Sequence, residues 1–132
     1  MNIALFSRSS DEAGLQFIKD TISSLHQQND KVWLFEGMID FMSEENSVSL
    51  SGYIHNKKEL IEHNIDFIFS IGGDGTFIDA ANIVADSAVP ILGINTGRIG
   101  FLTNIAPNNF NHAYQCIKER RYQIEERSLL HI

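Results

Sequence analysis

Several features typical of secreted and membrane proteins are scarce in this sequence. Its 132 residues include a single cysteine, Cys116, so no internal disulfide can form. No apolar run approaches the roughly 20 residues that a membrane-spanning helix needs. The first residues also lack the charged region of a signal peptide. These absences predict a protein of the reducing cytoplasm that does not enter a membrane.

Positive charge is scarce as well. The chain carries 10 lysine and arginine residues against 17 acidic residues, which gives a formal net charge of -7. A surface with this balance repels polyanions, so we expect no binding to nucleic acid. The 43% hydrophobic and 20% charged residues are typical of a soluble globular domain.

Apolar stretches alternate with amphipathic stretches along the chain. Compact apolar runs predict strands at residues 3–6, 32–35, 66–71 and 89–94. Helical spacing predicts helices after a Ser-Ser-Asp cap at residues 9–11, and at residues 57–63, 76–86 and 107–118. The inward helix positions include Leu60, Ile61 and Ile78, and residues 36–52 are expected to be mostly loop.

Strands that are apolar throughout and alternate with helices predict an α/β fold. The expected architecture is a three-layer, Rossmann-like open sheet, mostly parallel, with helices on both faces. Ligands of such sheets bind beyond the carboxyl ends of the strands, so the loops that follow strands are the candidate sites.

A glycine-rich loop follows the strongest predicted strand. It consists of Gly72, Gly73, Asp74, Gly75 and Thr76, directly before a predicted helix. Glycines let a ligand approach the backbone amides, and a helix N-terminus adds free N–H groups and partial positive charge. The loop lacks the lysine of a Walker motif and the third glycine of a dinucleotide fingerprint. It therefore predicts a phosphate-binding loop of another kind.

Asp74 is the unusual member of this loop, because a carboxylate repels phosphate unless it serves the chemistry. It can hold Mg²⁺ that bridges to phosphate oxygens, or accept a proton from a hydroxyl that attacks the phosphate. The alternative is structural: Asp-Gly forms a turn, and Asp74 or Thr76 caps the following helix. Local chemistry leaves both interpretations open.

A second glycine-bearing loop follows the strand predicted at residues 89–94. It begins with Asn95 and Gly97 and continues through Arg98 to Phe101. Arg98 can contact phosphate and Phe101 can stack on a base. Alternatively, Arg98 is solvated and Phe101 packs over the core.

Together the two loops resemble the NAD kinase family. The match consists of Gly-Gly-Asp-Gly-Thr-Phe at residues 72–77 and Gly-Ile-Asn-Thr-Gly-Arg-Ile-Gly-Phe-Leu at residues 93–102. Phosphofructokinases and diacylglycerol-type lipid kinases carry loops similar to the first, so the second segment makes the match specific. The resemblance covers essentially the whole chain and implies the fold of the phosphofructokinase and NAD kinase N-terminal domains.

The resemblance also implies an activity. NAD kinases transfer the terminal phosphate of ATP, or of polyphosphate, to the 2′-hydroxyl of the adenosine ribose of NAD, which yields NADP. Asp74 would be the base that acts on this hydroxyl. Gly72, Gly73, Gly75 and Thr76 would form the phosphate-facing loop.

The second loop would contribute to nucleotide binding by the same resemblance. Phe101 would line the dinucleotide site near adenine, Asn95 and Gly97 would shape the approach, and Arg98 would contact phosphate. The family uses a divalent cation, usually Mg²⁺, and usually forms homodimers or homotetramers. No protein ligand for the metal is predicted in this chain.

The resemblance further divides the chain. Residues 1–124 are expected to form the nucleotide-binding domain, and residues 125–132 the crossover into a β-rich second domain. We therefore expect residues 1–132 alone to bind NAD poorly and to turn over little or nothing. Two other function classes stay open: a lipid or sugar kinase on the same scaffold, and a non-catalytic nucleotide-binding module.

Overall fold

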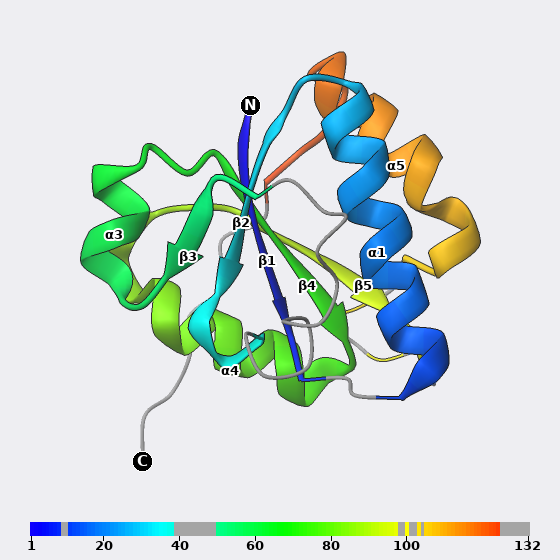
Figure 1. The fold of residues 1–132 in the computed structure, drawn as a ribbon, viewed down its shortest axis with the longest axis horizontal. Helices are drawn as coiled ribbons and strands as arrows, with labels where there is room; N and C mark the ends of the chain where they lie inside the picture. Colours follow the sequence, from blue (N-terminus) through cyan, green and yellow to red (C-terminus); the bar gives the residue numbers. More distant parts are fainter. Residues whose placement is uncertain (9–10, 39–49, 98–99, 101–102, 104, 125–132) are drawn as a thin grey trace.

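A computed structural model describes residues 1–8, 11–38, 50–97, 100, 103 and 105–124 of the chain. They form a five-stranded parallel sheet with strand order β3-β2-β1-β4-β5 (Figure 1). The strands are β1 Asn2–Ser7, β2 Lys31–Phe35, β3 Gly52–Ile54, β4 Phe67–Gly72 and β5 Ile91–Asn95. The α-helices are α1 Glu12–Gln27, α3 Lys57–Glu62, α4 Asp74–Val84 and α5 Phe110–Lys118. Short 3₁₀ turns follow β2 at Glu36–Met38, follow α4 at Ala85–Ser87 and precede α5 at Pro107–Asn109.

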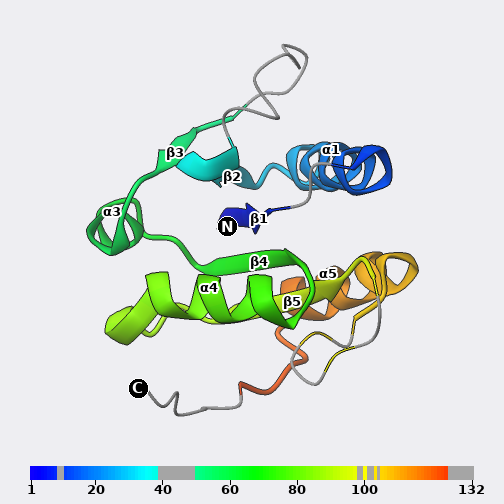
Figure 2. The same ribbon diagram turned by 90° about the horizontal axis from the view of Figure 1, so that it is seen from below.

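Helices cover both faces of the sheet, as predicted. Figure 2 shows α1 and α5 on one side and α3 and α4 on the other. Alternate residues of each strand supply the two faces: Ile3 and Leu5 of β1 join the α1 and α5 core, and Ala4 and Phe6 join the α3 and α4 core. The sheet is thus buried on both sides, which explains its continuous apolar strands.

The predicted strands and helices are all present, with shifted ends. The first helix begins after Asp11, whose carboxylate accepts a hydrogen bond from the Gly14 amide at 2.6 Å. The last predicted helix starts as a 3₁₀ turn and becomes α-helical only at Phe110. The strand predicted at residues 89–94 begins after Pro90, which has no amide to donate to the ladder.

One strand, β3, was missed by the sequence prediction. It has three residues at the end of the sheet and pairs in parallel with β2. Its first residue, Gly52, has φ +155°, and a Cβ there would lie 2.8 Å from the Trp33 ring. A strand this short, opened by a glycine that fits against an aromatic ring, leaves no periodic apolar signal.

Two predicted inward positions are wrong. Ile61 is 60% exposed and Ile78 is 40% exposed, whereas Leu60, Ala80 and Val84 are buried. Helix α4 begins at Asp74, two residues before the predicted start, and Ala80 and Val84, about one turn apart, lie on its buried side. Ile78 lies two residues before Ala80, and at about 100° per residue this spacing places it on the opposite side of the helix.

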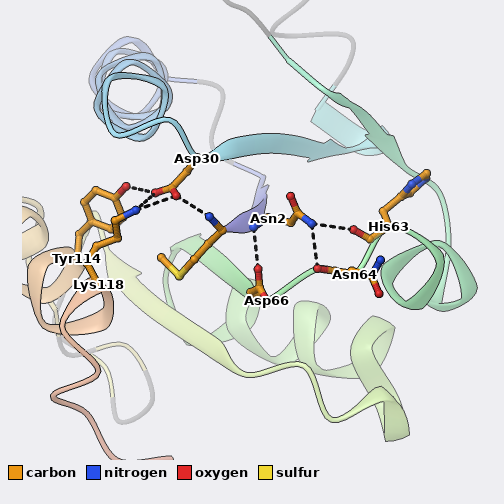
Figure 3. A network of polar contacts seen from close by, with 8 residues as sticks. Asn2, Asp30, His63, Asn64, Asp66, Tyr114 and Lys118 are labelled. Atoms are coloured by element: carbon orange, nitrogen blue, oxygen red, sulfur yellow. Dashed lines mark hydrogen bonds and ion pairs between the residues drawn. The ribbon is translucent and has the colours of Figure 1, made fainter.

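A network of polar contacts closes the amino edge of the sheet (Figure 3). The Asp30 carboxylate, 1% exposed, accepts hydrogen bonds from the Met1 nitrogen at 2.7 Å and Lys118 Nζ at 2.8 Å, and from the Tyr114 hydroxyl. Burial alone would raise the pKa of Asp30, but the donors outweigh it and hold that pKa below its ordinary value. Burial and the bond to Asp30 raise the pKa of the Tyr114 hydroxyl.

Among the described helices, none combines the length and apolar character needed to span a bilayer.

Candidate active site

The strand order reverses direction between β1 and β4, so their carboxyl ends flank the switch point where α/β sheets bind ligands. The first loop at this point is the glycine loop after β4. At Gly72, φ is +155° and a Cβ would lie 2.7 Å from Thr76 Oγ1. A side chain at this position is excluded by the close approach of the threonine. Gly72 therefore allows the chain to turn directly from β4 into α4.

Asp74 is the first residue of α4 and not a member of an extended loop. Gly73 is the N-cap, without a side-chain cap, and its carbonyl accepts the Phe77 amide at 3.0 Å. The proposal that Asp74 or Thr76 caps the helix is therefore wrong. A carboxylate in the first helical turn is stabilised by the positive end of the helix dipole, which favours this early start.

The Asp74 carboxylate is half-buried and held by a residue far along the chain. Its Oδ1 accepts the Thr103 amide at 3.2 Å and the Thr103 hydroxyl at 3.1 Å. Both donors stabilise the ionised carboxylate and fix its orientation.

Gly100 packs directly against this carboxylate. A Cβ at Gly100 would lie 2.2 Å from Asp74 Oδ1 and 2.5 Å from its Cγ. No real Cβ makes contacts so short, so the close approach of the two segments requires glycine at this position.

The end of β5 lies beside the glycine loop. Asn95 pairs with Gly72 in register, and the Thr96 amide donates to the Gly72 carbonyl at 3.1 Å. Asn95 is 4% exposed, and its side chain bonds Thr103 and the Gly97 amide. The two predicted loops thus form one continuous site.

Arg8 extends the site to the neighbouring strand. It follows directly after β1, and its guanidinium forms an ion pair with Asp79 of α4 at 2.9 Å. The Arg8 side chain is 68% exposed, so the cation lies at the surface of the carboxyl edge. A lone arginine after a strand belongs to no motif, so Arg8 was not predicted as a site residue from the sequence.

Most of the predicted site residues come together at this edge. Each of the following lies in the first turn of α4, at the end of β4 or at the end of β5: Gly72, Gly73, Asp74, Gly75, Thr76, Asn95 and Gly97. Arg98 and Phe101 lie outside the described residues, as does the predicted crossover at 125–132. Their roles stay predictions.

A cavity of about 430 Å³ lies elsewhere, at the amino edge of the sheet. Its lining includes Asp66, Lys118, Arg120 and Tyr122. Ligands of parallel α/β sheets bind at the carboxyl ends of the strands, and the glycine loops lie at that opposite edge. We therefore place the candidate site at the carboxyl edge.

A family model for the ATP-NAD kinase N-terminal domain matches residues 14–122, which include both glycine loops. The chain belongs to the ATP-NAD kinase family.

Individual relatives agree with this family assignment. The chain is 32% identical over 130 residues to an NAD kinase of Flavobacterium psychrophilum, covering 98% of this chain and 44% of that protein. It is 46% identical over 67 residues to an NAD kinase of Bacteroides fragilis, covering 51% of this chain and 23% of that protein. The chain thus spans less than half the length of these NAD kinases.

The fold is also found in a solved structure. Yeast NADH kinase complexed with NADH matches with a TM-score of 0.75 at 17% sequence identity, covering 92% of this chain and 38% of that protein. At this identity the likeness shows a shared fold, and the predicted three-layer α/β architecture is confirmed.

Proposed function

We propose that the protein is an NAD kinase that transfers the terminal phosphate of ATP, or of polyphosphate, to the 2′-hydroxyl of the adenosine ribose of NAD. The observation that carries the proposal is the placement of Asp74. This carboxylate lies at the switch point, at the start of a helix, between two glycine segments, in a chain of the ATP-NAD kinase family.

Asp74 acts as the general base in this proposal. Its carboxylate accepts the proton of the ribose hydroxyl as the hydroxyl oxygen forms a bond to the terminal phosphorus. The bond from that phosphorus to the bridging oxygen breaks, and ADP, or the shortened polyphosphate, leaves. The amides of the loop around Gly73 and the first turn of α4 stabilise the negative charge on the transferred phosphate.

Phosphoryl transfer of this kind also needs a divalent cation. Among the described residues, no group of three or more His, Cys, Asp or Glu side chains is placed to hold a metal ion. Magnesium in phosphoryl-transfer sites is usually bound by one or two carboxylates together with substrate phosphates. In this site Mg²⁺ would be held by the phosphates of the donor and would neutralise their charge, and Asp74 serves as the base and not as a metal ligand.

The remaining features of the proposal concern the acceptor and the assembly. The structural relative was solved with NADH, which supports a nicotinamide dinucleotide as the acceptor. Arg98 as a phosphate contact and Phe101 near adenine belong to the proposal, as do cytoplasmic location and a homo-oligomeric assembly. Since the chain spans less than half of its relatives, we also propose that residues 1–132 alone turn over little or nothing.

The test is NADP formation by the protein in the full length that its gene encodes. NAD, ATP or polyphosphate, and Mg²⁺ are supplied, and NADP is measured with an NADP-specific dehydrogenase. Asp74→Asn keeps the shape but removes the base, so we expect kcat to fall by about 100-fold or more. The matched control is Asp86→Asn, which removes an 86% exposed carboxylate beyond the far end of α4 and should leave kcat unchanged.

The outcomes separate the function classes. NADP formation that depends on Asp74 but not on Asp86 supports the proposed kinase. Phosphorylation of a diacylglycerol or of fructose 6-phosphate instead of NAD would indicate the lipid or sugar kinase. Nucleotide binding that is unchanged in Asp74→Asn, without turnover of any acceptor, would indicate a binding module.

A further inference from the structure

Thr103 is a buried residue that links both glycine loops. It is 0% exposed and lies 29 residues from Asp74 along the chain. Its amide and its hydroxyl both donate to Asp74 Oδ1, at 3.2 and 3.1 Å. The hydroxyl of Thr21, which is also buried, donates instead to the Phe17 carbonyl within α1.

Asn95 fixes the direction of the Thr103 hydroxyl. Asn95 Oδ1 accepts the Gly97 amide at 2.7 Å, so the other end of the side chain, Nδ2, must face Thr103. Asn95 Nδ2 lies 3.1 Å from Thr103 Oγ1 and 3.2 Å from the Thr103 carbonyl oxygen. An amide nitrogen only donates, so Thr103 Oγ1 accepts from Asn95, and its single proton is directed to Asp74.

The result is a directed chain of hydrogen bonds. The Gly97 amide donates to Asn95, the Asn95 amide group donates to Thr103, and the Thr103 hydroxyl donates to Asp74. Successive bonds of the same direction polarise one another and strengthen the last one. The carboxylate at the end of this chain is therefore stabilised in its ionised form.

We infer that Thr103 is a positioning residue for the reaction, which holds the Asp74 carboxylate ionised and in one orientation. Asn95 acts through Thr103 and sets the direction of its proton. This inference rests on the proposed function, because it assigns the role of Asp74 as the base. Its consequence is specific: loss of the hydroxyl should change the pH range in which the base works.

The experiment compares Thr103→Val with Thr103→Ser in the full-length protein. Valine keeps the shape and the backbone amide but removes the hydroxyl, whereas serine keeps the hydroxyl. For Thr103→Val we expect kcat to fall by about 10- to 100-fold, the size expected for one hydrogen bond to a charged group. The KM for NAD should stay nearly constant, and the acid limb of the kcat profile should move to higher pH. Thr103→Ser should keep both kcat and the position of the acid limb close to those of the parent.

Thr21→Val is the matched control. Thr21 is also a buried threonine, 1% exposed, but its hydroxyl donates to the Phe17 carbonyl within α1, away from the site. This variant can lower stability and should leave the pH profile unchanged. It separates the loss of a buried hydroxyl from the loss of the contact with Asp74.

Two results would overturn the inference. One is an acid limb in Thr103→Val that coincides with that of the parent, even if kcat falls. The other is a Thr103→Ser variant as impaired as Thr103→Val. If circular dichroism shows that Thr103→Val does not fold, Asn95→Asp is measured in its place. A carboxylate at residue 95 should attract the Thr103 hydroxyl proton away from Asp74. An acid limb that does not move in this variant would also overturn the inference. Absence of NADP formation in the parent would instead contradict the proposed function.

Discussion

The two edges of the sheet each hold an aspartate in a hydrogen-bond network, but the donors differ. At the amino edge, Asp30 is buried and accepts bonds from Lys118 and the Met1 nitrogen (Figure 3). At the carboxyl edge, Asp74 is half-buried and accepts bonds on Oδ1 from the amide and hydroxyl of Thr103, which are uncharged. The first arrangement neutralises a buried charge, and in the second the Thr103 donors orient a half-buried carboxylate.

Because of this difference, replacement of the aspartate should have different effects at the two edges. Removal of a buried, ion-paired carboxylate leaves its partners without a counterion, so the loss falls on stability. Removal or displacement of an oriented, half-buried carboxylate leaves the fold intact, so the loss falls on the reaction.

The largest expected effect on stability is at Asp30. In Asp30→Ala, Lys118 and the Met1 nitrogen lose their counterion and the Tyr114 hydroxyl loses its acceptor. We expect the free energy of unfolding to fall by about 3 kcal/mol, with activity of the folded fraction retained. Urea unfolding and NADP formation measure the two quantities. Unfolding that matches the parent would show that the network is not a source of stability.

The next effect is on the reaction, at Gly100. In Gly100→Ala the new methyl group must displace the Asp74 carboxylate, because the two would lie 2.2 Å apart. We expect kcat to fall by about 100-fold, since small misplacements of a catalytic group have costs of this size. Gly37→Ala is the control, because a Cβ there meets no atom within 4 Å. Equal activity of the two variants would contradict the close packing of Gly100 on Asp74.

The smallest effect is a pH dependence of stability at the amino edge. The pKa of Asp30 is lower in the folded protein than its ordinary value of about 3.9. Its contribution is therefore complete above that ordinary value and is lost as pH falls through the lowered folded pKa. Asp30→Asn should lose less stability on acidification than the parent. Guanidinium unfolding at a series of acidic pH values tests this, and parallel curves would contradict it.

The local sequence predicted the parts of the fold with strong short-range signals. The residues of β4 form a nearly continuous apolar run followed by glycines, so both the strand and the turn were evident. The residues of α1 combine an aspartate cap with helical apolar spacing. By contrast, β3 forms because its three residues pair with β2 and because Gly52 fits against the Trp33 ring. Both contacts join residues that lie far apart in the sequence, so no local pattern predicts them.

The same division holds within the candidate site. The sequence by itself determined the glycine loop, the carboxylate within it and the family to which the chain belongs, because these depend on contiguous residues with special backbone or chemical requirements. Only the tertiary structure decided that Gly100 lies against Asp74 and that Thr103 holds its carboxylate. These residues are separated from Asp74 by more than a helix and a strand, and only the parallel pairing of β4 with β5 brings them within contact distance.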